Sequence, residues 1–508
     1  MSPDTALDQD FGLITDLIHA YAQERPEHPA LIHDGHVLSY GALDQLMDRV
    51  AASLQRDGVQ PGEVISICAA SCVEYGAIFL GALRAGVAVA PLAPSSTPEA
   101  LATMLSDCSA KVLFLDDPIA AALEGQALPA ALRQVPMSLR GWLAPPDAKP
   151  RSVNVDPGAP FNIIYSSGTT GSPKGIVQSH RMRWAHVHRA ALARYDRTAV
   201  TICSTPLYSN TTLVSFFPTL ARGGTVVLMA KFDALRFLEL AQQHRATHAM
   251  LVPVQYQRIM DLPEFGRFDL ASFRMKFCTS APFAAALKTQ ILERWPGGLT
   301  EYYGMTEGGG SCILYAHEFP DKLHTVGQPA PGHEVRLIDE HGREVARGEV
   351  GEIVGRSPAS MMNGYFNQPG KTADAEWYDG EGNRYIRTGD VGRFDEQGFL
   401  TLLDRRKDMI ISGGFNIYPS DLESVVIRHE AIEEVAVVGV PSRQWGETPV
   451  AFVVLKPGRA ATAEEIRAWA NERLGKTQRL ASVEIREALP RSAIGKVLKR
   501  ELREEYGK

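Results

Sequence analysis

One stretch of the sequence decides how the rest of the chain is interpreted: YSSGTTGSPKG at residues 165–175. It follows the apolar run Phe161–Tyr165, which predicts a short strand, and most of its residues are Ser, Thr or Gly. Hydroxyls, backbone N–H groups near Gly168 and Gly171, and the charge of Lys174 form the donor set that a polyphosphate needs. The stretch is not a Walker A loop, because only two residues separate those glycines and the lysine follows a proline. The alternative interpretation is a flexible Ser/Gly linker.

Length and composition indicate a globular protein of more than one domain. The chain has 508 residues, of which 45% are hydrophobic and 22% charged, and its formal net charge is −7. This charge disfavours nucleic acid as the main partner. No apolar run predicts a membrane span, and the first residues do not resemble a signal peptide. The six cysteines form no C-x-x-C pair and most lie in apolar runs, which predicts buried free thiols and a cytoplasmic location.

The order of strand-like and helix-like segments predicts the fold class. Strand-like runs at 64–69, 87–91 and 111–115 alternate with helix-like segments, and the alternation resumes from residue 225. This pattern predicts an α/β fold with a large N-terminal part, in which helices cover parallel sheets. From about residue 335, short strands and turns predict a small β-rich subdomain. The tail mixes strands and helices, so we expect domains of residues 1–404 and 405–508, with residues 117–160 as a connecting region.

Four further motifs follow the first in order along the chain. They are EYYGMTE at 301–307, TGD at 388–390, DRRKDMIISGGFNIYP at 404–419 and LPRSAIGKVLKR at 489–500. Taken singly, each has a structural explanation as exposed side chains, a turn, a solvated loop or a basic tail. The first of the four follows a predicted strand, where α/β folds usually build their sites.

Together the five motifs resemble those of the adenylate-forming superfamily, which includes acyl- and aryl-CoA synthetases, luciferases and the adenylation domains of peptide synthetases. The resemblance covers nearly the whole chain and implies an AMP-forming acid–CoA ligase that uses ATP, Mg²⁺ and coenzyme A. It also implies that residues 405–508 form a small mobile α+β lid, which swings about Lys407 between the two half-reactions. Asp404 stands where the family usually has Gly, which is a mild departure from the hinge motif.

The resemblance assigns roles to individual residues. It implies that Tyr303 stacks on adenine, that Asp390 accepts hydrogen bonds from the ribose hydroxyls, and that Lys496 bridges the substrate carboxylate and the phosphates. Catalytic roles are implied for Lys174, Thr306, Glu307 and Lys496, with Glu307 as the metal ligand. ATP contacts are implied for Ser166, Ser167, Gly168, Thr169, Thr170, Gly171, Lys174, Ala281, Tyr303, Thr306, Asp390, Arg405 and Lys496. The glycines Gly413 and Gly414 are implied to let the arm of CoA pass close to the backbone.

The acid substrate is the least constrained part of this interpretation. The implied substrate-binding residues are Tyr208, Ser209, Asn210, Ser280, Gly304 and Met305. Many relatives carry His where Ser209 stands, so the loss of that ring opens the pocket or changes its polarity. The run Gly308–Gly310 either makes room at the pocket floor or forms a tight turn. Neither Lys nor Arg in these segments demands a second carboxylate, so we expect an aromatic or medium-chain monocarboxylic acid.

Two other functions are compatible with the sequence. A free-standing adenylation enzyme would load a carrier protein supplied in trans, since the chain ends soon after Lys496. A non-catalytic nucleotide-binding homologue would keep the fold without the reaction. Against it, the sequence keeps the residues that the resemblance implies for the reaction: Lys174, Thr306, Glu307, Asp390, Arg405 and Lys496. The expected partners are therefore the acid, ATP and CoA, with no nucleic acid and no membrane span. The sequence leaves a homodimer open.

Overall fold

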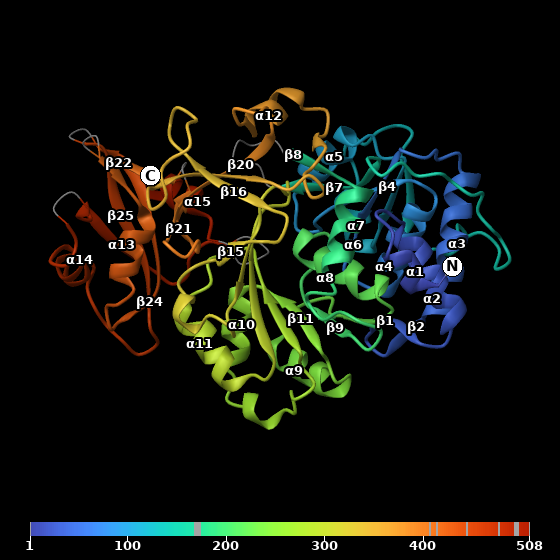
Figure 1. Ribbon diagram of the computed structural model, residues 1–508, viewed down its shortest axis with the longest axis horizontal. Coiled ribbons are helices and arrows are strands. Elements are labelled where there is room, and N and C mark those ends of the chain that lie inside the picture. Colours follow the sequence, from blue (N-terminus) through green and yellow to red (C-terminus); the bar gives the residue numbers. More distant parts are fainter. Residues whose placement is uncertain are drawn as a thin grey trace. The chain divides into compact units, whose positions relative to one another are not determined.

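Two compact units divide the chain (Figure 1). The computed structural model describes residues 2–166, 174–405, 408–412, 415–442, 445–475, 478–491 and 497–506. The large unit comprises Met1–Leu323, Pro329–Glu334 and Gly355–Ile386. The small unit comprises His324–Gln328, Val335–Val354 and Arg387–Lys508.

A seven-stranded sheet in the large unit has the strand order β18-β8-β7-β4-β3-β5-β6. Its strands are β3 (Val64–Cys68), β4 (Ala88–Pro91), β5 (Val112–Leu115), β6 (Arg133–Pro136), β7 (Pro160–Ser166), β8 (Lys174–Ser179) and β18 (Gly364–Tyr365). The strands from β6 to β7 run parallel, whereas β8 is antiparallel to both β7 and β18. Every residue of β3 and β4 is buried, as expected for parallel strands that are covered on both faces.

A second sheet of the large unit contains strands in the order β14-β13-β12-β11-β9-β10-β1-β2. Its strands are β1 (Pro29–His33), β2 (His36–Ser39), β9 (Val200–Cys203), β10 (Thr225–Leu228), β11 (His248–Leu251), β12 (Met275–Cys278), β13 (Gly298–Tyr303) and β14 (Cys312–Tyr315). The strands from β1 to β13 pair in parallel, and β2 and β14 are antiparallel at the ends. The carboxyl end of β13 therefore carries the motif that begins at Tyr303.

The helices of the large unit cover both sheets. They are α1 (Pro3–Leu7), α2 (Ile14–Glu24), α3 (Tyr40–Arg56), α4 (Val73–Arg84), α5 (Pro98–Asp107), α6 (Asp117–Ala122), α7 (His180–Arg189), α8 (Asn210–Ala221), α9 (Ala234–Gln243), α10 (Pro253–Met260), α11 (Ala285–Arg294) and α12 (Pro369–Asp374), with 3₁₀ turns at Phe265–Arg267 and Pro320–Lys322. Helix α4 contacts strands of both sheets, while α8 packs on the second sheet. The expected fold class, parallel sheets covered by helices, is confirmed.

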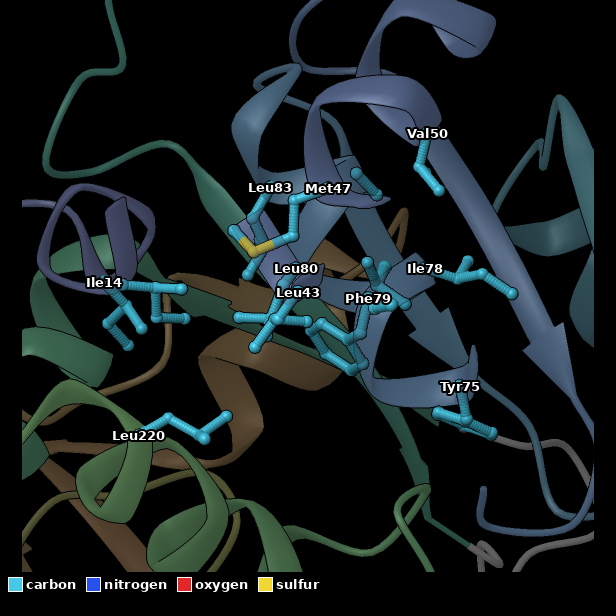
Figure 2. Packing of buried hydrophobic residues seen from close by; sticks show 14 of the residues in the cluster. Ile14, Leu43, Met47, Val50, Tyr75, Ile78, Phe79, Leu80, Leu83 and Leu220 are labelled. Atoms are coloured by element: carbon cyan, nitrogen blue, oxygen red, sulfur yellow. The ribbon is translucent and has the colours of Figure 1, made fainter. Parts of the chain in front are cut away.

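The main core lies among α2, α3, α4 and α8 (Figure 2). Figure 2 shows Leu43 and Met47 of α3 beside Leu80 and Leu83 of α4, with Ile14 of α2 and Leu220 of α8 nearby. The two long helices approach closely at Gly81, where an added Cβ would lie 2.6 Å from the Cβ of Val50. A larger residue at this position would force α3 and α4 apart and open a gap in the core.

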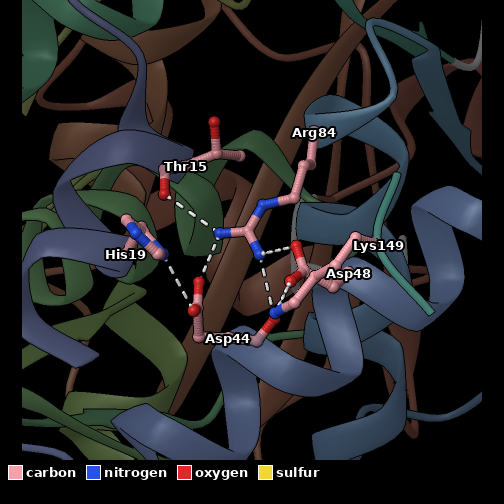
Figure 3. A network of polar contacts seen from close by, with 6 residues as sticks. All are labelled: Thr15, His19, Asp44, Asp48, Arg84 and Lys149. Atoms are coloured by element: carbon pink, nitrogen blue, oxygen red, sulfur yellow. Dashed lines mark hydrogen bonds and ion pairs between the residues drawn. The ribbon is translucent and has the colours of Figure 1, made fainter. Parts of the chain in front are cut away.

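An arginine at the end of α4 ties three helices together (Figure 3). The two Nη atoms of Arg84 donate to Asp44 Oδ1 at 2.6 Å and to Asp48 Oδ1 at 2.7 Å, both on α3. Arg84 also donates to the backbone oxygen of Thr15 on α2 at 3.3 Å. His19 and Lys149 contact the outer oxygens of the two carboxylates. The positive charge of Arg84 is thus matched by two carboxylates.

The small unit is built around a sheet with the strand order β23-β22-β25-β24, to which β26 adds beside β25. Its elements are β21 (Leu400–Arg405), β22 (Ile410–Ser412), β23 (Phe415–Ile417), α13 (Pro419–Val426), β24 (Ile432–Ser442), β25 (Gly446–Leu455), α14 (Ala463–Asn471), β26 (Ser482–Arg486) and α15 (Lys499–Tyr506). Buried apolar residues on both faces of this sheet form two clusters, around Val437 and around Val438. The expected α+β character of the C-terminal part is confirmed.

The chain passes from one unit to the other within four strands. They are β15 (Gln328–Pro329), β16 (Glu334–Ile338), β17 (Gly351–Arg356) and β20 (Arg384–Phe394). Within the large unit β20 pairs with β19 (Glu376–Tyr378), and within the small unit it pairs with β21. These short strands correspond to the β-rich region expected from about residue 335.

Local sequence signals located many of these elements. Asp34 and Gly35 form the turn of the hairpin between β1 and β2, with φ of 45° and 79°, as an Asp-Gly pair favours, and the side chain of Ser39 caps α3. The region 117–160, which is expected to be a connecting region, contains the short elements α6 and β6. Strand β6 buries only Val135, so it lacks the apolar alternation by which a strand is recognised.

Two further expectations concern the cysteines and the membrane. All six cysteines are free, and five of them are buried. Burial raises the pKa of the Cys203 thiol to about 12, so this sulfur is protonated and unreactive at neutral pH. Within the described ranges, no helix is long and apolar enough to cross a membrane.

Candidate active site

The predicted phosphate loop connects the two strands of an antiparallel hairpin. Ser166, the last residue of β7, stands opposite Lys174, the first residue of β8. The predicted ATP-binding residues Ser167, Gly168, Thr169, Thr170 and Gly171 lie outside the described residues, as does the side chain of Ser166. Strand β7 is parallel to β4, so its last residue lies at the carboxyl edge of the sheet. This is the edge at which α/β folds bind ligands.

Lys174 lies beside two groups from distant parts of the chain. Its Nζ atom lies 4.9 Å from the ring centroid of Tyr365, and the Tyr365 hydroxyl donates a hydrogen bond of 2.9 Å to Glu307 Oε1. Burial, together with the negative charge of Glu307, raises the pKa of the Tyr365 phenol well above its usual range. The phenol therefore stays protonated and keeps donating to the carboxylate. The structure thus links the predicted residues Lys174 and Glu307 through Tyr365, which contacts both.

Backbone pairing fixes the position of Tyr365. Strand β18 pairs with β8, so that Tyr365 lies opposite Ile176, and the Tyr365 N–H donates to Thr372 Oγ1 at 2.9 Å. The N–H of Met362 donates to the backbone oxygen of Glu307 at 2.8 Å. The motifs in the sequence do not predict a role for Tyr365, because nothing near it distinguishes it from an ordinary strand residue.

The last residue of β13 and the segment that follows it hold five of the predicted site residues. Tyr303 is buried, whereas Gly304 is exposed and Met305, Thr306 and Glu307 are half-buried. A side-chain nitrogen of Gln178, Nε2, donates to the backbone oxygen of Thr306 at 2.6 Å. Gln178 lies on β8, four residues after Lys174. The same strand therefore carries Lys174 and contacts the segment of Thr306.

Close backbone approach explains the glycine run that follows Glu307. An added Cβ at Gly308 would lie 2.0 Å from the backbone oxygen of Ser360, and Gly308 has a φ of 74°. The N–H of Gly309 donates to that same oxygen at 2.9 Å. A side chain could not be accommodated there, so the tight-turn interpretation of Gly308–Gly310 accounts for at least its first two residues.

The predicted substrate-binding residues lie at the start of α8 and after β12. Ser209 precedes the helix without a side-chain capping bond, and Asn210 is its first residue. Thr211 and Ser280 share a hydrogen bond of 2.6 Å between their hydroxyls. Ser280 has a φ of 82°, which a residue with a side chain adopts only when its surroundings hold it there.

Two other predicted residues complete this part of the site. Tyr208 lies directly before Ser209 and is half-buried, and burial raises the pKa of its phenol. Ala281 follows the strained Ser280 and is half-buried. The two segments are therefore linked through Thr211 and Ser280, which places most of the predicted acid-binding residues in one part of the large unit.

The predicted ribose ligand lies in the small unit. Asp390 is on β20, opposite Arg405 of β21 in the register, and its backbone N–H donates to Thr388 Oγ1 at 3.0 Å. Thr388 in turn donates to the backbone oxygen of Ile353 at 2.9 Å, which fixes the turn at Gly389 with its φ of 69°. The side chain of Arg405 lies outside the described part of the chain, as do Lys407, Gly413, Gly414 and Lys496.

The site is compatible with a single hard cation. Glu307 Oε1 accepts from Tyr365, and its second oxygen makes no hydrogen bond within the described ranges. Among these residues no group of three or more His, Cys, Asp or Glu could form a metal cage. Mg²⁺ in nucleotide enzymes is commonly held by one or two carboxylates together with phosphate oxygens, so a lone Glu307 fits this ion.

The family models identify the class of enzyme to which this fold belongs. The profile of the AMP-binding enzyme family matches residues 18–366, and that of the AMP-binding enzyme C-terminal domain matches residues 421–496. The chain therefore belongs to the AMP-binding enzyme family, and the predicted adenylate-forming superfamily is confirmed.

Individual relatives narrow the class further. The chain is 34% identical over 494 residues to a feruloyl-CoA synthase of an Amycolatopsis species, covering 96% of this chain and 97% of the relative. It is 31% identical over 498 residues to a fatty acid–acyl-carrier-protein ligase of Streptomyces coeruleorubidus, covering 96% and 95%. The crystal structure of ATP-bound MatB from Rhodopseudomonas palustris matches with a TM-score of 0.87 at 29% identity, covering 97% and 99%. The prediction of an AMP-forming acid–CoA ligase is thus confirmed at the level of the enzyme class.

Proposed function

We propose that this chain activates an aromatic or medium-chain monocarboxylic acid with ATP and then transfers the acyl group to coenzyme A. The observation that carries the proposal is the cluster of Lys174, Tyr365 and Glu307 beside the ends of the predicted phosphate loop. A cation, a hydrogen-bond donor and a carboxylate are held there by three separate segments. This is an arrangement for binding a polyphosphate together with its metal ion.

The chemistry requires two anions to be brought together. In the first step a carboxylate oxygen of the acid attacks the α-phosphorus of ATP, and the bond to the bridging oxygen of pyrophosphate breaks. In the second step the CoA thiol attacks the acyl carbon, a thioester forms, the thiol proton is lost, and AMP leaves. Lys174 would offset the repulsion between the carboxylate and the phosphates in the first step.

Glu307 is the residue that would hold Mg²⁺ in this proposal. Bound to phosphate oxygens, the ion supplies charge neutralisation and orients the leaving group. The Tyr365 hydroxyl holds one oxygen of the Glu307 carboxylate in place, which leaves the other for the metal. Glu307 would also keep the metal next to the segment of Thr306, whose hydroxyl would bind the α-phosphate or the substrate carboxylate.

The remaining predicted residues complete the proposal through the family resemblance. Contacts with ATP would come from Ser166, Ser167, Gly168, Thr169, Thr170, Gly171, Ala281, Tyr303, Asp390 and Arg405. Lys496 would bridge the reacting groups, Gly413 and Gly414 would line the path of CoA, and Lys407 would be the hinge between domains of residues 1–404 and 405–508. A cytoplasmic location and a homodimer stay predictions.

The acid is proposed from the residues around Asn210 and Ser280. Tyr208, Thr211 and the half-buried Met305 offer an apolar lining with a few hydroxyls. The contacts of Asn210 and Thr211 with other side chains show that their polar groups are engaged within the protein. A monocarboxylic acid with an apolar body suits such a surface better than a dicarboxylic acid.

A carrier protein is the second candidate for the acyl acceptor. The similarity to a fatty acid–acyl-carrier-protein ligase favours it, because that relative covers nearly the whole chain at 31% identity. In this alternative the first half-reaction is the same, and the thiol of a carrier's phosphopantetheine arm replaces that of CoA.

The deciding experiment is ATP–pyrophosphate exchange over a panel of aromatic and aliphatic acids, followed by acceptor addition. Acid-dependent exchange and an acyl-CoA product would support the main proposal. Exchange without acyl transfer to CoA, but with transfer to a purified carrier protein, would support the second. Folded protein that binds ATP and exchanges pyrophosphate with none of the acids would favour a non-catalytic homologue.

A further inference from the structure

A buried arginine lies beneath the proposed site without a carboxylate partner. Arg183 of α7 is 1% exposed, and it forms no ion pair within the described ranges. Its Cζ atom lies 5.8 Å from the ring centroids of both Phe161 and Phe217. Burial lowers the pKa of this guanidinium to about 9, which still leaves it charged at neutral pH. Burying a charge without an opposite charge is costly, so the position needs an explanation.

Three side-chain amides supply the hydrogen-bond acceptors for this cation. Arg183 Nε donates to Asn162 Oδ1 at 2.9 Å, and Nη2 donates to Asn210 Oδ1 at 2.9 Å and to Gln178 Oε1. The remaining nitrogen, Nη1, has no partner in the described part of the chain. The two N–H groups of Nη1 are therefore left unsatisfied among the described residues, so hydrogen-bond satisfaction alone does not explain this position.

The guanidinium dictates which way each amide faces. Arginine can only donate hydrogen bonds, so each of the three amides must turn its oxygen towards Arg183. For Gln178 this leaves the NH₂ group facing the opposite way. That group donates to the backbone oxygen of Thr306 at 2.6 Å and to Asn210 Oδ1 at 3.4 Å. The cation thus reinforces the orientation in which Gln178 Oε1 accepts from Arg183 and Asn162 while its NH₂ group donates to Thr306.

The amides come from segments that carry the proposed site. Asn162 lies on β7 and Gln178 on β8, which flank the predicted phosphate loop and pair with each other in the register. Asn162 Nδ2 donates to Gln178 Oε1 at 2.9 Å. Asn210 is the first residue of α8, and Thr306 precedes Glu307. One guanidinium thus links the loop strands, the proposed acid-binding helix and the metal-binding segment.

We propose that Arg183 is a positioning residue, which acts through the amide of Gln178 to hold Thr306 and Asn210 in the positions that adenylation requires. The proposal rests on the proposed function, because these fixed positions would serve the first half-reaction. Arg183 contacts no reacting atom in this proposal. Its contribution is a preorganised site, in which the Thr306 carbonyl is fixed before substrates bind.

The sharpest test separates stability from catalysis by isosteric substitution. Gln178→Glu keeps the acceptors for Arg183 and adds a charge that pairs with it, but it replaces the donor to Thr306 with a repelling oxygen. We expect the thermal midpoint of this variant to stay within about 2 °C of wild type, while the acid-dependent exchange rate falls at least about tenfold. A drop in kcat with little change in the KM for ATP is expected, because the contact acts on the reacting geometry.

A matched control carries the same substitution at another buried glutamine. Gln255 is 6% exposed and its Nε2 donates to the backbone oxygen of Ser204 at 3.4 Å, but no arginine of the described residues forms a hydrogen bond with it. Gln255→Glu buries an unpaired charge, so we expect its thermal midpoint to fall by about 4 °C or more with exchange per folded molecule unchanged. Gln178→Glu is thus expected to lower the pyrophosphate exchange rate and not the thermal midpoint, and Gln255→Glu is expected to do the opposite.

Variants of Arg183 and a second readout complete the test. Arg183→Lys keeps a donor-only cation and should recover part of the exchange that Arg183→Met loses. Hydrogen exchange of the peptide spanning residues 304–311 should accelerate in Gln178→Glu and Arg183→Met but not in Gln255→Glu. This second readout needs no acid, so it decides the positioning role even if wild type activates none of the acids and the proposed function fails. The proposal would be overturned if Gln178→Glu kept the wild-type rate of pyrophosphate exchange. It would also be overturned if Arg183→Lys and Arg183→Met lost this rate equally.

Discussion

Two arginines of the large unit, the half-buried Arg84 and the buried Arg183, are held in opposite ways. Arg84 lies at the junction of three helices, and two carboxylates, Asp44 and Asp48, accept its hydrogen bonds at 2.6 and 2.7 Å (Figure 3). Arg183 lies beneath the proposed site, and among the described residues only neutral amide oxygens accept from it. The first arrangement neutralises its charge, while the second provides no counter-charge and no partner for one nitrogen within the part of the chain that the structure describes.

This difference separates a structural role from a positioning role. Partners that carry opposite charge hold an arginine strongly, and removing one side leaves the other charge buried and alone. Amide partners contribute less to stability, but they are oriented by the cation, because an amide has distinguishable ends and a carboxylate does not. An arginine surrounded by amides therefore transmits direction, here to the backbone of Thr306.

The largest expected effect is a loss of stability at the first arginine. Arg84→Met leaves Asp44 and Asp48 with only His19 and Lys149 as partners, so we expect the free energy of unfolding to fall by about 3 kcal/mol. Urea denaturation would measure it. Arg236→Met, which removes an exposed ion pair with Glu239 at 3.0 Å, is the control and should cost less than about 0.5 kcal/mol. Similar losses in both variants would remove the structural role assigned to Arg84.

A buried lysine allows the cost of an uncompensated cation to be read from pH. Lys276 is fully buried, and its Nζ donates to the backbone oxygens of Trp295, Pro296 and Gly297 at 3.1, 2.7 and 2.7 Å. Burial lowers its pKa to about 7. The unfolded chain then binds more protons than the folded protein between pH 7 and the usual lysine value. The contribution of Lys276 to stability therefore rises with pH across this window.

The corresponding experiment compares slopes of stability against pH. Between pH 7 and 9, wild type should gain on Lys276→Met by up to about 1.4 kcal/mol per pH unit in the free energy of unfolding. Lys456→Met is the control, because Lys456 is exposed and donates to a single backbone oxygen at 3.1 Å. Parallel curves for wild type and Lys276→Met would show that neutral oxygens compensate a buried cation fully, which would weaken the contrast between Arg84 and Arg183.

A smaller change in stability is expected at the second arginine. Arg183→Met replaces a cation that lacks a counter-charge, so we expect it to cost about 1–2 kcal/mol, which is less than Arg84→Met costs. Its exchange rate should nevertheless fall at least about tenfold, whereas Arg84→Met should keep the wild-type rate per folded molecule. Urea denaturation and pyrophosphate exchange on the same preparations would check both values. An unfolded Arg183→Met protein would place Arg183 in the same structural class as Arg84.

The smallest expected effect concerns the neutral partner of a charged group in the site. Tyr365→Phe removes the hydrogen bond of 2.9 Å to Glu307 but keeps the ring beside Lys174, so we expect about a threefold loss of exchange rate. Tyr378→Phe is a matched control, since the Tyr378 hydroxyl donates to Glu376 at the same 2.9 Å on the surface. Equal rates for wild type and Tyr365→Phe would show that the phenol does not orient the carboxylate.

The sequence located the proposed site through motifs whose residues are neighbours in the chain. The loop at 165–175 and the motif at 301–307 were recognised because a few adjacent residues carry the hydroxyls, glycines and charges that their chemistry needs. The alternation of strands and helices likewise predicted the fold class, since it is a local pattern. The edge strand β6 was missed because its single buried residue, Val135, leaves no alternation to detect.

What only the tertiary structure decided are the contacts between segments that are far apart in the chain. Tyr365 meets Glu307 across 58 positions, Gln178 meets Thr306 across 128, and Arg183 meets Asn210 across 27. In the sequence, Arg183 is one of several cations in a basic run, and Gln178 is an ordinary strand residue. Their roles arise because the strands flanking the loop are buried beside α7 and α8, where a donor-only cation and three amides have few other partners. Sequence alone thus determined the class of protein and the chemistry of its motifs, while packing decided which side chains hold those motifs in place.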